Sequence, residues 1–250
     1  MTIHEYIKKA YKGIKDQPRK ERLSYLWDYY KWHLIVLVAV IAVSAQIIAG
    51  ICTRKDSVFF GFLLNCKINT QNEAYLQGFY DYAGIDGDKQ EAAFYTDVIL
   101  TDRNAQSDIT AFQRILAGVA TKETDFIAGP AEAFQVCAYN SSRILVDLRD
   151  FFEEETLKQF SDRLYYIDKA VLEKFDAPPG AAMDPSLLTY PDPTKPELME
   201  QPIPVGIDIS DLEDFKEAYY FPDTVLYFGI IANTPRSQLV NQFVEYLFKQ

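Results

Sequence analysis

The chain has 250 residues, enough for one or two domains, and its 48% hydrophobic and 24% charged composition is globular rather than disordered. The formal net charge of -11 is unevenly divided: residues 1–33 carry +4, residues 34–52 carry none and residues 53–250 carry -15. This acidic bulk argues against nucleic acid as a partner, because phosphate binding requires clustered Lys and Arg. It also disfavours close approach to an anionic membrane surface.

The first segment, residues 1–33, predicts a basic amphipathic helix. Apolar residues recur at helical spacing between Tyr6 and Ile14, and lysines fill the positions between them. Such a tail could lie on the inner leaflet of a membrane, hold a partner or simply set the topology of the chain. The sequence leaves these three roles open.

The next segment, residues 34–52, predicts a transmembrane helix. Its only polar side chains before Cys52 are Ser44 and Gln46. Residues 34–51 span about 27 Å as a helix, close to the ~30 Å hydrocarbon core of a bilayer.

Three other interpretations fit the same apolar segment. A buried core helix normally has some polar face, and a signal peptide normally has a shorter apolar run, although Val43-Ser44-Ala45 resembles a cleavage site. A lipoprotein would be acylated on Cys52, but Ile51 stands where a small residue is normally required.

The orientation of this helix follows from charge. The basic excess predicts that residues 1–33 stay in the cytoplasm and that residues 53–250 lie outside it, on the far side of the membrane. Tyr and Trp side chains prefer the boundary between water and lipid, and both tryptophans of the chain lie just before the apolar run. The predicted membrane interface consists of Tyr25, Trp27, Tyr29, Tyr30, Lys31 and Trp32.

Strands and helices alternate in the first half of the outer part. Apolar runs predict strands at 58–64, 92–100, 124–128 and 164–167, and helical spacing or start signals predict helices after Thr70, at 109–119, after Pro130 and near 150–160. Gly84 and Gly87 are expected to end the first of these helices. The alternation predicts an α/β fold with a mainly parallel sheet and helices on both of its faces.

The second half begins with a proline-rich stretch. Eight of the twelve prolines lie between residues 178 and 204, which predicts a long irregular loop over residues 176–204 that excludes a helix or a central strand. Strands are then expected at 204–209 and 225–232, and a last amphipathic helix after Thr234-Pro235.

Three segments carry a resemblance to a known family. They are AFQRILAGVATKETDFIAGPAEAF (111–134), RILVDLRDFF (143–152) and YFGIIANTPRSQLVNQFVEYLF (227–248). Their order of helix, short strand and new helix, then a turn, a late strand and a final helix, resembles extracellular solute-binding proteins. The outer part therefore resembles a type 2 periplasmic-binding-protein-like domain on a membrane anchor, as found in Gram-positive bacteria.

The resemblance covers residues 58–168 and 203–249. It implies two α/β lobes with a ligand between them. After residue 168 the sequence offers only the proline-rich loop and a short return, so the second lobe is expected to be reduced or missing.

The outer part has few groups for catalysis. The only histidines are His4 and His33, so a Ser-His-Asp triad, a Cys-His pair and histidine metal sites are excluded after residue 53. Carboxylate-only chemistry stays possible. We expect no enzymatic activity, no catalytic residues, no cofactor and no metal site; the acidic residues from Asp208 to Asp214 lack the pattern of a calcium loop and predict a helix start.

Cys66 and Cys137 are the two thiols clear of the apolar run. Outside the cell they could form a disulfide, or they could be small core residues. The sequence leaves both possibilities open.

A ligand is expected near the carboxyl ends of the strands, as in other open α/β sheets. The Gly129-Pro130 helix start could hold an anion with its amide groups, and each residue could instead serve as a turn or a cap. The candidate ligand-binding residues are Asn65, Asp102, Gly129, Asp168 and Asp208, with Tyr190 from the proline-rich loop.

Two functions follow. The first is a membrane-anchored, extracytoplasmic, non-catalytic binding domain for a small molecule or peptide. The second is an interaction or assembly module that docks on another membrane protein and has lost ligand binding. A ligand role predicts a concave pocket lined by aromatic side chains at the strand ends. An assembly role predicts an exposed apolar patch of several hundred Å² and no such pocket.

Overall fold

The computed structural model describes residues 19–52, 55–101, 106–139, 143–175, 189–223 and 225–249. The chain divides into two compact units, Met1–Arg54 and Lys55–Gln250.

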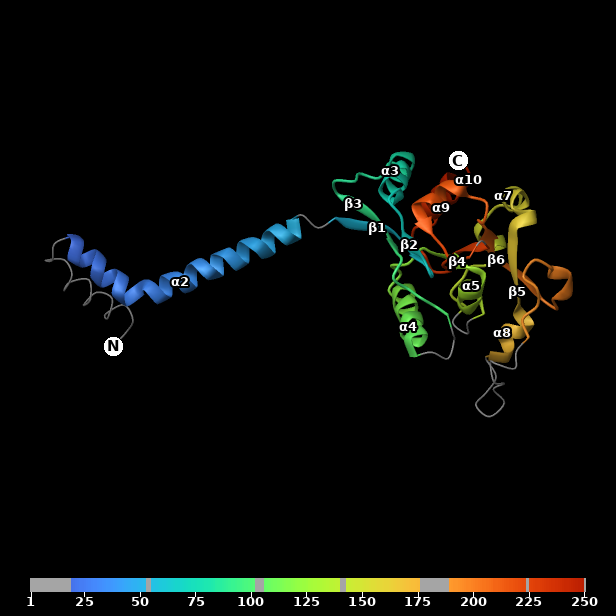
Figure 1. The fold of residues 1–250 in the computed structure, drawn as a ribbon, viewed down its shortest axis with the longest axis horizontal. Helices are drawn as coiled ribbons and strands as arrows, with labels where there is room; N and C mark the ends of the chain where they lie inside the picture. Colours follow the sequence, from blue (N-terminus) through green and yellow to red (C-terminus); the bar gives the residue numbers. More distant parts are fainter. Residues whose placement is uncertain are drawn as a thin grey trace. The chain divides into compact units, whose positions relative to one another are not determined.

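The first unit contains helix α2 (Arg19–Cys52) (Figure 1). Its segment Lys31–Gly50 is 20 residues long, has a mean hydropathy of 2.3 and buries none of its side chains in the protein. By length and composition this helix can cross a membrane. Trp27 and Trp32 are exposed to 61% and 69%, whereas the side chains of Tyr25, Tyr29 and Tyr30 lie outside the described part.

The second unit is built on a mixed six-stranded sheet in the order β3-β1-β4-β8-β6-β5 (Figure 1). The strands are β1 (Asp56–Leu63), β3 (Gln90–Tyr95), β4 (Phe126–Pro130), β5 (Leu164–Asp168), β6 (Pro202–Asp208) and β8 (Leu226–Ile230). β1 is parallel to β3 and β4, but the pairs β4-β8, β8-β6 and β6-β5 are antiparallel. A second, two-stranded sheet pairs β2 (Lys67–Ile68) with β7 (Tyr219–Tyr220).

The α/β class is therefore confirmed, but the prediction of a mainly parallel sheet is wrong. A parallel neighbour requires a connection that crosses from one edge of the sheet to the other. The chain leaves β6 and enters β8 at the same edge, and it leaves β5 and enters β6 at the same edge. An alternation of strands and helices in the sequence does not reveal to which edge a connection returns.

Helices cover both faces of the sheet, in agreement with the sequence prediction. In Figure 1 one group lies above the strands and the other below them. The first group comprises α3 (Asn72–Ala83), α9 (Glu213–Ala218) and α10 (Ser237–Phe248). The second comprises α4 (Gln106–Ala120), α5 (Ala131–Ala138) and α8 (Lys169–Phe175).

Alternation along the strands builds one apolar core on each face. In β1, Phe59 and Leu63 belong to the core between the sheet and helices α3 and α10. Phe62 belongs to the core between the sheet and helices α4 and α5. Short helices α6 (Leu148–Phe151) and α7 (Glu154–Gln159), then a 3-10 turn (Ser161–Arg163), lead into β5. Phe152 and Phe160 from this connection join the first core.

Several element boundaries differ from the prediction. α3 begins at Asn72, close to the predicted start after Thr70, although Gln71 before it makes no side-chain cap. Gly84 ends this helix with φ of 70°, as predicted. β3 ends at Tyr95, short of the predicted strand end at residue 100.

The proline-rich loop also differs. Its residues 176–188 lie outside the described part, and β6 begins at Pro202 rather than at the predicted Pro204. Pro202 and Pro204 are tolerated because they pair only with β5, whereas β8 pairs only with Ile207 and Asp208. The prolines thus lie where the strand has one neighbour instead of two.

Candidate functional site

The predicted ligand-binding residues lie at two opposite edges of the sheet. β1, β4 and β6 run in the same direction, because β8 is antiparallel to both β4 and β6. Asn65, Gly129 and Asp208 therefore share the edge where these strands end, which we call the carboxyl edge. β5 runs the opposite way, so Asp168 lies at the other edge. Asp102 lies outside the described residues.

At the carboxyl edge, the three predicted residues make local structural contacts. The Asn65 side chain donates to the carbonyl of Leu100 (2.8 Å) and accepts from its N–H (2.7 Å), which ties residues 96–100 to the end of β1. A Cβ on Gly129 would lie 2.7 Å from the Leu64 Cβ, so glycine permits this close approach. Asp208 accepts from the N–H of Ser210 (2.8 Å).

At the opposite edge, Asp168 organises the chain that returns from the proline-rich loop. Its carboxylate accepts from the N–H groups of Ala170 (3.0 Å), Glu200 (2.9 Å) and Gln201 (3.0 Å). Burial raises the pKa of Asp168, but these three hydrogen bonds outweigh burial and lower the pKa overall. Tyr190 packs against Tyr139, with ring centroids 4.6 Å apart.

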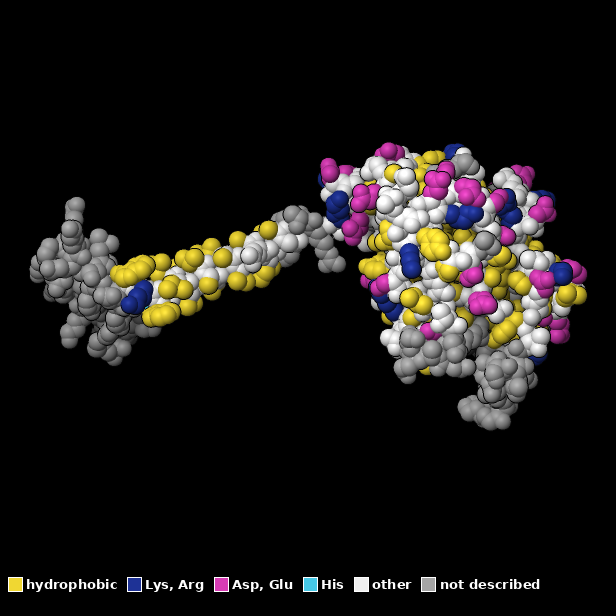
Figure 2. Space-filling model, viewed as in Figure 1, with side chains coloured by type: hydrophobic (Ala, Val, Ile, Leu, Met, Phe, Trp, Pro, Cys, Tyr) yellow, Lys and Arg dark blue, Asp and Glu magenta, His cyan; other side chains and the backbone are white. Residues whose placement is uncertain are grey.

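Large apolar side chains are exposed on the segments around the carboxyl edge. Ile68, Ile99, Tyr220 and Val225 are exposed to 55%, 60%, 51% and 43%. We call these four residues the carboxyl-edge surface. Figure 2 shows separate groups of hydrophobic side chains across the middle of the α/β unit, one of them over the region where β2 and β4 lie in Figure 1, with charged side chains between the groups. The sequence did not mark these residues as a surface, because Ile99 and Val225 fell inside predicted strands and Ile68 and Tyr220 fell outside any predicted element.

A second feature is a groove floored by phenylalanine rings. Neighbouring rings contact one another in a row, with centroid distances of 4.9 Å from Phe151 to Phe152, 5.9 Å from Phe152 to Phe160 and 5.0 Å from Phe160 to Phe248. Two hollows share Phe248: one of ≈ 610 Å³ between α6–α7 and α10, and one of ≈ 360 Å³ between α10 and residues 211–215. We call the two together the Phe248 groove. They contain none of the sequence-predicted ligand residues.

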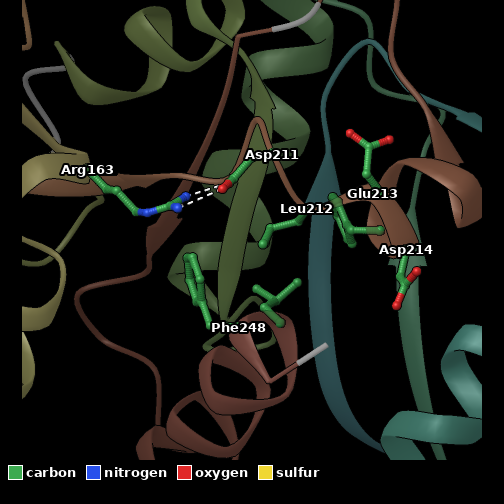
Figure 3. A pocket seen from close by; sticks show the side chains of 8 residues that line it. Arg163, Asp211, Leu212, Glu213, Asp214 and Phe248 are labelled. Carbon is green, nitrogen blue, oxygen red and sulfur yellow. Dashed lines mark hydrogen bonds and ion pairs between the residues drawn. The ribbon is translucent and has the colours of Figure 1, made fainter.

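The rim of the Phe248 groove carries an ion pair beside its shared ring. Arg163 holds both carboxylate oxygens of Asp211, with 2.6 Å between Nη2 and Oδ2, and its guanidinium lies 5.7 Å from the Phe248 ring centroid. Figure 3 shows these side chains reaching toward each other next to Phe248. Hydrogen bonding to Asp211 raises the pKa of Arg163, and hydrogen bonding to Arg163 lowers the pKa of Asp211.

The cysteines and acidic groups offer no further site in the described part. Cys66 and Cys137 are buried in the cores on opposite faces of the sheet and are not joined to each other. Burial raises the pKa of the Cys66 thiol to about 12. Among the described residues, no group of three or more His, Cys, Asp or Glu side chains is placed to hold a metal ion.

Comparisons with known proteins identify no relative. No family model matches the chain, and no significant match is found among curated proteins or solved structures.

Proposed function

We propose that this chain is a single-pass membrane protein whose residues 55–250 form an extracytoplasmic, non-catalytic interaction module for another membrane protein. The apolar, unburied segment of α2 supports anchoring. The reversal from +4 before the apolar run to -15 after it supports the orientation. The lack of histidine after residue 53 supports a non-catalytic role.

The observation that carries this proposal is the carboxyl-edge surface. Ile68, Ile99, Tyr220 and Val225 expose large apolar side chains around the edge where an open α/β sheet would bind its ligand. Exposed apolar groups on neighbouring segments are typical of a surface that a partner covers. Ile68 and Tyr220 point to opposite faces of the β2-β7 pair, so the partner would contact this pair on both faces. A protein partner would bury these side chains, and the removal of their apolar surface from water would stabilise the complex.

The small-solute function predicted from the resemblance has weaker support. The described residues of the second unit form one six-stranded sheet with a core on each face, beside the small β2-β7 sheet. A solute at the carboxyl edge would have no second lobe among these residues to close over it. Solute binding therefore stays a prediction, and the experiment below distinguishes it from docking.

The test is native electrophoresis of the full chain extracted from its membrane in a mild detergent. A double variant, Ile68→Asp with Tyr220→Asp, should shift the protein from a larger complex to the mass of the free chain, because two carboxylates would have to be desolvated at the contact. The matched control is Leu198→Asp, which changes a leucine with 64% exposure just before Glu200, whose N–H donates to Asp168 at the opposite edge.

Two results would contradict the docking proposal. One is a wild-type chain that migrates at the mass of the free chain. The other is a complex that dissociates equally in the Leu198→Asp control. A thermal-shift screen of the same preparation with amino acids, sugars and peptides provides the comparison, since a specific solute should raise the melting temperature by mass action.

A further inference from the structure

We propose that the Phe248 groove binds a basic peptide segment of a partner protein, with large apolar residues placed between lysines or arginines. The groove shares no residue with the carboxyl-edge surface. It is thus a second recognition site beyond the proposed docking surface, and its test is independent of that one.

The floor of the groove provides the apolar part of this recognition. Phe152 and Phe160 are 8% exposed, and the rings of Phe151 and Phe248 beside them are partly exposed. Val244 adds an aliphatic contact from α10. Contacting rings with partly open faces form a concave surface that an aliphatic or aromatic side chain can fill without opening the core.

The rim provides the charge. Five carboxylates line the two hollows against two cations: Glu153, Asp211, Glu213, Asp214 and Glu245 against Arg163 and Lys249. This excess of negative charge around an apolar floor complements a peptide that carries positive charges on both sides of its apolar residues.

The two cations of the rim are already engaged within the protein. Arg163 is held by Asp211, and Lys249 donates to the Tyr82 hydroxyl (2.8 Å) and lies 4.4 Å from the centroid of that ring. They are therefore poorly placed to receive an anionic ligand. Anionic lipid or an acidic peptide would in addition be repelled by the carboxylate excess.

Two of the carboxylates are left for a partner. Glu213 pairs with Lys216 (2.8 Å), and Glu245 accepts from the Tyr82 hydroxyl (2.7 Å). Within the described part of the chain, no ion pair engages Glu153 or Asp214, and both are exposed. Because Glu153 lines one hollow and Asp214 the other, they mark the two ends at which cationic side chains of the peptide would bind.

The test measures peptide binding by fluorescence anisotropy, with the full chain in nanodiscs of zwitterionic phosphatidylcholine. The probe is a fluorescein-labelled peptide with a Leu-Phe centre flanked by lysine pairs, and the comparison peptide has glutamates in place of the lysines. We expect the lysine peptide to bind more tightly. The double variant Glu153→Lys with Asp214→Lys should weaken it by about tenfold, the combined effect of two exposed charge contacts.

The matched control is Glu155→Lys with Glu197→Lys, which changes the net charge equally at exposed positions outside the groove. This control should alter the peptide affinity by less than about twofold, because salt screens the electrostatic attraction from charges outside the groove. Equal weakening by both double variants would show that the peptide is attracted only by the net negative charge of the protein. Equal binding of the glutamate peptide would show that the peptide binds only through its Leu-Phe centre. Either result overturns the proposal.

A third variant, Phe248→Ala, tests the floor. It removes the ring that both hollows share and should weaken the lysine peptide at least as much as the charge reversal. If its melting temperature shows that it is unfolded, the exposed charge variants decide the question alone. An unchanged affinity in a folded Phe248→Ala protein would contradict the proposed site.

Discussion

Asp125 is fully buried, and its charge is met by groups from three parts of the chain. Its carboxylate accepts from the Phe60 N–H (2.8 Å), from the Thr234 hydroxyl, and from Arg236 Nε at 2.9 Å to each oxygen. Arg236 also donates to the carbonyl of Glu123 (2.6 Å). This network joins β1, the segment entering β4 and the start of α10.

Replacing Arg236 should therefore be among the most destabilising changes in the second unit. Arg236→Ala leaves a buried carboxylate without its cation and should lower the free energy of unfolding by about 3–5 kcal/mol. Arg149→Ala, which breaks the more exposed pair with Asp147, should cost under about 1 kcal/mol. Urea unfolding followed by circular dichroism of the full chain in detergent measures both. Similar midpoints for the two variants would contradict a structural role for the buried pair.

Asp168 should make stability depend on acidity. Its pKa in the folded chain lies below the ordinary 3.8, so its carboxylate stabilises the fold at pH values above 3.8. This stabilisation is lost as the pH falls below 3.8 and through the folded pKa, because the unfolded state then binds the proton more readily.

Asp168→Asn should remove about 1–3 kcal/mol of stability at neutral pH, since an amide is a weaker acceptor for three backbone donors. The loss should shrink as the pH falls below 3.8 toward the lowered pKa of the native carboxylate. Unfolding midpoints measured between pH 3 and pH 7 compare the variant with the native chain. A loss that is the same at every pH would show that the charge of Asp168 contributes nothing.

At the scale of the element, β3 is an outer strand of the six-stranded sheet, and a side chain from α3 protects its unpaired side. The Tyr80 hydroxyl accepts from the Ala92 N–H (2.7 Å) and lies 3.4 Å from the Ala92 carbonyl. An edge strand with unsatisfied backbone groups is a template for pairing with another chain. Tyr80 covers this edge and secures α3 to the sheet.

Tyr80→Phe should keep the packing of the ring and lose only the hydroxyl. We expect a loss of about 0.5–1.5 kcal/mol and faster hydrogen exchange at the Ala92 amide. Hydrogen–deuterium exchange with mass spectrometry measures the peptide that covers β3, with the peptide that covers β8 as an internal control. Unchanged protection of Ala92 would show that the hydroxyl is not needed at this edge.

The elements also show which parts of the fold can be predicted from the sequence. Long apolar runs gave β1 and β8, and helical periodicity gave α4 and α10, because burial of one face leaves a local pattern. The direction of β8 and the pairing of Pro202 and Pro204 with β5 depend on long-range neighbours, and no local pattern contains them.

The candidate site shows the same division. Residues at strand ends such as Asn65 and Asp208 could be located from the sequence. The sequence could not show which of these residues lie together at one edge of the sheet, because that depends on the direction of each strand. The Phe248 groove brings together residues 151–163, 211–215 and 241–249. Their conjunction depends on how α10 packs beside α7, so composition and spacing could not reveal it.

For the whole molecule, the decisive question is on which side of a membrane the acidic unit lies. The charge asymmetry predicts that residues 1–33 are cytoplasmic and that residues 55–250 are not. Single engineered cysteines can test this in intact cells, because burial raises the pKa of Cys66 to about 12 and Cys137 is also buried. A Cys52→Ser background therefore has little intrinsic reactivity toward a maleimide reagent.

In that background, Lys158→Cys on α7 should react with a membrane-impermeant maleimide in cells whose outer layers have been removed, since Lys158 is exposed. Lys8→Cys should react only after the membrane is permeabilised. The mass of the labelled protein is a control for processing: a chain that keeps its anchor retains the full 28.7 kDa, whereas a cleaved signal peptide would remove the N-terminal segment. Reaction of Lys8→Cys in sealed cells, with Lys158→Cys protected, would reverse the topology and place both proposed binding surfaces in the cytoplasm.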